Sequence, residues 1–236
     1  MSVLTSVGIL VLAVFACAFL QLAPSIFAIF YHYASARNSR EKVFDLSSWF
    51  MVGAEIMCGT VLFLLYFSTF FFLDDNPGFS LTLPSYIMAG ILFALGIFML
   101  CFYYRRRGST ELFVPRKIAK SITLRAKNAK KPSDIIALGM TASLMEFIFT
   151  LPVYLVVVVT LINLKCDAIW QPLLLITFII FNMLPLMLVR SQFHFSRLNL
   201  AEIMRSKLKN KNFFRFALTI SYMLLAAIIV IVEITK

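Results

Sequence analysis

Long apolar runs constrain this chain more than any other feature of its sequence. Six segments are long enough to cross a hydrocarbon core of about 30 Å, which takes about 20 apolar residues: 3–33, 47–73, 85–104, 134–163, 170–189 and 214–234. Backbone polar groups in lipid must be satisfied within the segment or in a closed barrel, and these runs are too long and too uniformly apolar for barrel strands. The sequence therefore predicts an all-α polytopic membrane protein with six transmembrane helices.

The positions of the basic residues predict the orientation of these helices. The chain has a formal net charge of +11, and 20 of its 22 Lys and Arg residues lie in the loops after the first, third and fifth apolar segments. The loop at 73–84 has none. Because cytoplasmic loops are enriched in Lys and Arg, we expect these three loops in the cytoplasm and both termini outside. The charge is thus explained by topology, and we expect contacts with anionic lipid headgroups and no nucleic-acid partner.

The longest polar interruption divides the chain into two halves of three helices. We expect a first half at 1–104, a basic cytoplasmic linker at 105–133 and a second half at 134–236. With an odd number of helices per half, a structural repeat has to be inverted in the membrane, and Pro24 and Pro152 lie at matching places in the first and fourth helices. The alternative is that both prolines are ordinary kinks.

The linker has the pattern of a short helix at the lipid surface. Ile118, Ile122 and Ala126 fall on one face with cations around them, so an amphipathic helix on the cytoplasmic leaflet is one interpretation and a solvated tether is the other. The cations that we expect to contact lipid are Arg105, Arg106, Arg107, Arg116, Lys117 and Lys120.

Two acidic residues, Glu55 and Glu146, lie well inside predicted spans. A charge at the bilayer centre costs at least about 2.5–3.5 kcal/mol, so such side chains face the bundle interior or a wet cavity. Glu146 is about 18 Å from the start of its helix, near the midplane, and Glu55 is about 12 Å from the same face. Desolvation favours the neutral acid, so we expect either residue to exchange a proton or bind a cation. The alternative is a structural acid that holds helices together.

Polar residues and helix breaks complete the predicted binding site. Prolines inside helices free backbone carbonyls, which build cation or substrate sites near a midplane acid. The predicted binding residues besides the two glutamates are Gln21, Ser25, Thr150, Tyr154 and Asn182, and the predicted breaks are Pro24, Pro152 and Pro185. His32, at the cytoplasmic end of the first helix, is either a proton relay or an interface residue among tyrosines.

The usual catalytic motifs are absent from the sequence. It has no Walker loop, GxGxxG, HExxH, GxSxG or CxxC, and only two histidines. Three of the four cysteines lie in predicted helices, where Cys usually behaves as a small apolar residue. We therefore expect no enzymatic activity, no cofactor and no metal centre, with an intramembrane enzyme built on the two acids as the alternative.

This architecture, with LQLAPS at 20–25 and FTLPVY at 149–154, resembles the LysE superfamily of exporters and its electron-carrying CcdA/DsbD branch. The resemblance implies an inverted-repeat carrier whose site lies between the proline-broken helices. The electron-carrying branch has a cysteine beside the proline of each half, whereas Ala23 and Leu151 precede the prolines here. The departure favours export of a solute or ion over transfer of electrons.

These features predict an inner-membrane carrier that works by alternating access on a small solute or cation, with proton coupling. A cation is favoured because the spans contain acids but no well-placed Lys or Arg. The alternative is a membrane scaffold or assembly factor whose basic loops bind lipid or a cytoplasmic partner. Charge reversal at 105–131 would impair the scaffold, whereas Glu146→Gln would impair the carrier.

Overall fold

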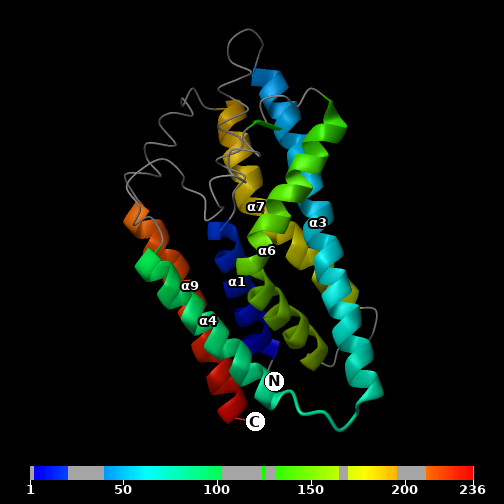
Figure 1. The fold of residues 1–236 in the computed structure, drawn as a ribbon, viewed down its shortest axis with the longest axis vertical. Helices are drawn as coiled ribbons and strands as arrows, with labels where there is room; N and C mark the ends of the chain where they lie inside the picture. Colours follow the sequence, from blue (N-terminus) through cyan, green and yellow to red (C-terminus); the bar gives the residue numbers. More distant parts are fainter. Residues whose placement is uncertain are drawn as a thin grey trace.

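The fold is a bundle of α-helices, known from a computed structural model that describes residues 3–20, 40–102, 124–125, 131–164, 170–195 and 211–235. The helices are α1 (Val3–Leu20), α3 (Arg40–Asp75), α4 (Thr82–Phe102), α6 (Pro132–Asn163), α7 (Trp170–Phe195) and α9 (Lys211–Ile234) (Figure 1). No strand occurs among these residues, so the all-α prediction is confirmed for the described part of the chain.

Several of the helices are long and apolar enough to cross a membrane. Phe44–Asp75, Thr82–Cys101 and Phe216–Ile234 meet this condition, and the two parts of the bent helix α6 make a fourth span if they are taken together. α1 and α7 contain shorter apolar stretches. Each predicted span therefore overlaps a described helix, the first only as far as Leu20, and the count of six spans stays a prediction.

The boundaries of the helices follow local chemistry. α3 starts at Arg40, before the predicted apolar segment, and ends at Asp75, where Pro77 and Gly78 follow. The side-chain amide of Asn76 donates to the carbonyl of Phe72 at 2.9 Å, which satisfies one of the last free carbonyls of the helix. α6 begins with a proline, whose missing N–H is not needed at that position.

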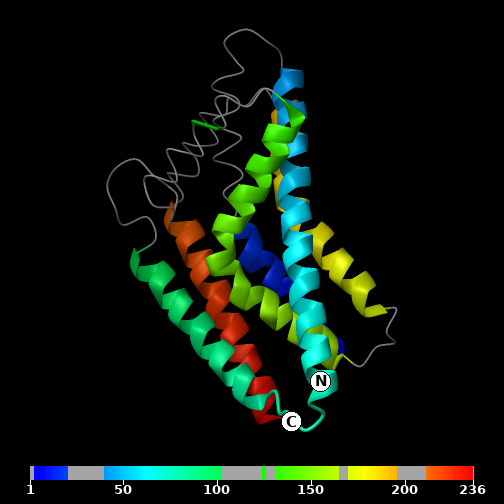
Figure 2. The same cartoon turned by 45° about the vertical axis from the view of Figure 1, so that its right-hand side comes forward.

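The helices alternate in direction along the chain. α1, α4 and α7 run towards one end of the bundle, and α3, α6 and α9 run towards the other, where both termini and the α3–α4 loop lie (Figures 1 and 2). Of the predicted basic linker, Leu124 and Arg125 are described as helical and exposed, and residues 131–133 lead into α6. The linker cations Arg105 to Lys120 lie outside the described residues.

Contacts between helices join the two halves of the chain. α3 packs most extensively against α6, and α4 against α9, while α1 contacts α6, α7 and α9. Among the described helices, α6 and α7 lie in the same half and share a contact, but it is smaller than the contacts between halves. The core is therefore built by helices that are distant in sequence.

α3 and α6 cross with their backbones in contact. A Cβ added at Gly53 would lie 2.9 Å from the Cα of Ile136, and one added at Gly139 would lie 2.9 Å from the backbone nitrogen of Ala54. The hydroxyl of Ser143, one turn beyond Gly139, donates to the carbonyl of Ala54 at 3.4 Å. Small residues permit such close approach of membrane helices, and this crossing fixes the helices that form the site.

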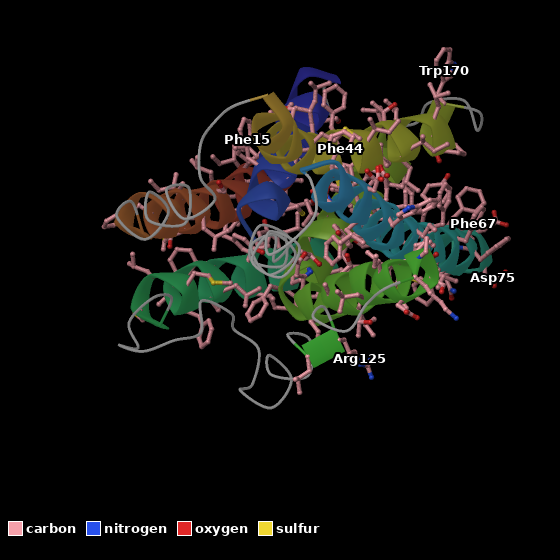
Figure 3. All side chains as sticks on the ribbon, turned by 90° about the horizontal axis from the view of Figure 1, so that it is seen from above. Phe15, Phe44, Phe67, Asp75, Arg125 and Trp170 are labelled. Atoms are coloured by element: carbon pink, nitrogen blue, oxygen red, sulfur yellow. The ribbon has the colours of Figure 1, made fainter. Side chains whose placement is uncertain are left out.

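Apolar side chains also cover the outside of the bundle, as expected for a surface in lipid. Phe63, Phe67 and Phe71 stack along α3 with ring centroids 6.4 and 6.3 Å apart, and the last two are exposed. Phe67 and Trp170 point away from the bundle in the view along its length (Figure 3). Helices that are apolar on all sides are typical of membrane spans.

Candidate functional site

The site is organised by a sharp bend in α6. Its two parts, Pro132–Phe147 and Phe149–Asn163, are inclined by 82°. Pro152 has no N–H to donate to the carbonyl four residues earlier, so the helical hydrogen bond at the bend cannot form. The hydroxyl of Thr150 donates to the carbonyl of Glu146 at 3.3 Å, a pattern that bends helices further.

A tyrosine from α9 stabilises the bend. The hydroxyl of Tyr222, a fully buried side chain, donates to the backbone carbonyl of Phe149 at 2.9 Å. This bond joins α9 to the backbone of α6 three residues before Pro152. The bend is thus held by an interaction between α6 and α9.

A small internal cavity lies beside the bend. Its volume is about 30 Å³, enough for about two water molecules. α1, α3, α6 and α7 all contribute to its lining. The polar and sulfur-containing residues that line it are Cys17, Met57, Cys58, Ser143, Glu146, Thr150, Tyr154, Asn182 and Met183.

Four of the predicted binding residues meet at this cavity. Glu146, Thr150 and Tyr154 are spaced by four residues, so they follow one face of α6 across the bend. Asn182 joins them from α7. Glu146 is half-buried, whereas the other three side chains are buried.

Sequence reasoning missed the residue at the centre of the polar contacts, Cys58. Its sulfur lies 3.1 Å from the hydroxyl of Tyr154, and the side-chain amide of Asn182 donates to it at 3.8 Å. Cys17 lines the same cavity, and both cysteines are buried free thiols. The available signal was that Cys58 follows Ala54 by one helical turn, a spacing of small residues that marks helix contacts but not a binding site.

Glu55 lies in a different environment from Glu146. It lines an open groove of about 630 Å³ on α3, closed on one side by Ile179 of α7. The rest of the groove is mainly apolar and includes Ile56 and Phe63. The two predicted acids therefore do not share a cavity.

The remaining predicted positions include four that the structure does not describe and one helix break that can be compared. Gln21, Pro24, Ser25 and His32 lie outside the described residues. α7 stays helical across Pro185, the third predicted break. Within the described ranges, no three His, Cys, Asp or Glu side chains are arranged to hold a metal ion.

No family model, curated protein or solved structure matches this chain. Its function is therefore inferred from the cavity and the helices around it.

Proposed function

We propose that the protein is an integral membrane carrier that moves a small cation across the bilayer in exchange for a proton. The observation that carries this proposal is the cavity at the bend of α6, where Glu146 lies beside buried polar groups inside a bundle of membrane-length helices. A titratable carboxyl group beside such a cavity can take up the proton that a bound cation displaces. Binding of a cation and release of a proton are therefore thermodynamically linked at this site.

The size of the cavity limits what this conformation can hold. About 30 Å³ accommodates a dehydrated ion or a few water molecules, but no amino acid. A small cation is therefore favoured over an organic solute. Alternating access would open this cavity to one side of the membrane at a time through movement of α6 or its neighbours.

The contacts between helices, apart from the small α6–α7 contact, have the pairing that an inverted repeat within a six-span carrier requires. Exchanging the halves replaces α1 by α6, α3 by α7 and α4 by α9. The pair α3–α6 then becomes α7–α1, and the pair α1–α9 becomes α6–α4, and all four pairs are in contact. The pairs α1–α6, α3–α7 and α4–α9 map onto themselves and are also in contact. We propose six spans in the inner membrane with both termini outside.

Proton flux in liposomes tests the proposal. The full chain is reconstituted with a pH-sensitive dye inside, and each cation is added outside in turn, starting with monovalent metal ions. We expect a cation-dependent change in internal pH that Glu146→Gln abolishes. Asp75→Asn, a change at an exposed acid at the end of α3, is the matched control and should leave the flux unchanged.

Glu55→Gln distinguishes the contribution of Glu55 to proton flux from that of Glu146. Because Glu55 lines the open groove and not the cavity, we expect this change to reduce flux less than Glu146→Gln does. Flux that is indifferent to Glu146→Gln would contradict the carrier proposal and favour the membrane scaffold.

A further inference from the structure

The cavity contains a group of sulfur atoms that proton coupling alone does not explain. Cys17 and Cys58 are 2% and 5% exposed and are free thiols. Met57 and Met183 line the same cavity. These four residues line the cavity from α1, α3 and α7 and offer it two thiols and two thioethers.

Cys58 has polar neighbours that an ordinary core cysteine lacks. The hydroxyl of Tyr154 lies 3.1 Å from its sulfur, and the amide of Asn182 donates to it at 3.8 Å. Both side chains are more than nine-tenths buried, at 6% and 4% exposure. Polar side chains of this kind also surround metal-bound thiolates.

The donor set determines the class of ligand. Thiolate and thioether ligands select soft ions such as Cu⁺, whereas Ca²⁺ and Mg²⁺ require several oxygen ligands. A structural zinc site needs four ligands, and the described residues contain no group of three His, Cys, Asp or Glu side chains arranged for a metal ion. A soft monovalent ion can be held by a pair of sulfur donors, and it fits the cavity volume.

We propose that the cavity binds one soft monovalent cation, Cu⁺ or its analogue Ag⁺, through the thiolate of Cys58, with Cys17, Met57 and Met183 supplying further sulfur donors. This proposal rests on the carrier function and names its cargo.

Proton exchange follows from the chemistry of the bond. When the sulfur–metal bond forms, the S–H bond of Cys58 breaks and its proton leaves, while copper stays in the +1 state. Glu146 lines the same cavity and relays this proton towards the aqueous side. One cation thus replaces one proton, and the charge of the cavity does not change.

The experiment measures Cu⁺ binding to the full chain in detergent under reducing conditions, in competition with a coloured Cu⁺ chelator. The starting variant is Cys101→Ser/Cys166→Ser, which keeps only the two cavity thiols; Cys101 is exposed on α4, and Cys166 lies outside the described residues. We expect one Cu⁺ per chain in this variant. Adding Cys58→Ser should weaken binding by more than about 100-fold, because even changes next to metal ligands cost about 10–100-fold.

A second measurement needs no change in the cavity. In the starting variant, bound Cu⁺ should produce the ultraviolet charge-transfer absorption of a copper–thiolate bond. Cu⁺ affinity that is unaffected by Cys58→Ser, or the lack of this absorption when Cu⁺ is added, would overturn the proposal.

Glu146→Gln distinguishes failure of this inference from failure of the carrier function. We expect this variant to retain one bound Cu⁺ while losing proton flux. Flux that depends on Glu146 with another cation, without Cu⁺ binding at Cys58, would overturn only the soft-metal site. Cu⁺ binding at Cys58 without any flux in the unchanged protein would overturn the carrier and leave a metal-binding membrane protein.

Discussion

Gly53 and Gly139 are the residues at which the α3–α6 crossing leaves no room for a side chain. A Cβ at either position would lie within 3 Å of backbone atoms of the other helix, and backbone cannot rotate away as a side chain can. The crossing sits directly before the cavity, whose lining includes Ala54 and Ser143. The absence of a side chain at these two glycines therefore permits the helix crossing that shapes the site.

Gly139→Ala should destabilise the protein by at least about 1–3 kcal/mol, the usual cost of overpacking, because α3 and α6 have to separate. The measurement is the thermal unfolding midpoint in detergent. Gly90→Ala is the matched control, since a Cβ at Gly90 meets nothing within 4 Å. Equal midpoints for the two variants would show that the helices are not in contact as described.

Glu146 and Cys58 show how far single residues could be recognised from the sequence. A carboxyl group inside an apolar run is costly, so Glu146 stood out by charge alone, and its four-residue spacing to Thr150 and Tyr154 placed those residues on the same face. A cysteine behaves as a small apolar residue, so Cys58 could face either lipid or the protein core and did not stand out in the sequence. Its neighbours Tyr154 and Asn182 are distant in sequence, so only the folded chain reveals them.

α6 is the element on which the site depends. Pro152 predicts an interruption of this helix from the sequence, because a missing N–H is a local property. The angle of 82° is not local, since it depends on contacts with other helices, including the bond from Tyr222 to Phe149. The first predicted helix could be compared only as far as Leu20, where the described part of α1 ends.

Tyr222→Phe should lower the stability of the protein by about 0.5–1.5 kcal/mol, the usual net contribution of one hydrogen bond, because it removes the bond to the carbonyl of Phe149 and keeps the ring. Thermal unfolding in detergent checks this, with Tyr86→Phe as the control at an exposed tyrosine of α4. If Tyr222→Phe unfolds no earlier than the control, the bend does not rely on this bond.

For the whole molecule, the alternation of helix directions and the distribution of charge both agree with the predicted topology, in which the two termini lie on the same side of the membrane. The α3–α4 loop, which has no Lys or Arg, lies at the same end as both termini. Trp49 and Trp170 are both exposed, one in the first turns of α3 and the other at the start of α7, so they lie towards opposite ends of the bundle, as expected for interface anchors.

Labelling of introduced cysteines tests this topology in intact cells. In the Cys101→Ser/Cys166→Ser variant, Gly78→Cys in the α3–α4 loop should react with a membrane-impermeant maleimide, and Lys131→Cys should react only after the membrane is opened. Both positions are exposed. The reverse pattern would invert the orientation, and labelling of both in intact cells would contradict a spanning topology.

The pairing of helices across the halves also has a consequence for how the protein is made. α3 and α4 find their main partners in α6 and α9, which are synthesised later. At about 5–20 residues per second, the first helices wait on the order of ten seconds before those partners leave the ribosome. During that interval Gly53, Ala54 and Cys58 face lipid or the insertion machinery instead of another helix. Biogenesis of this protein therefore depends on protecting an unfinished first half in the membrane.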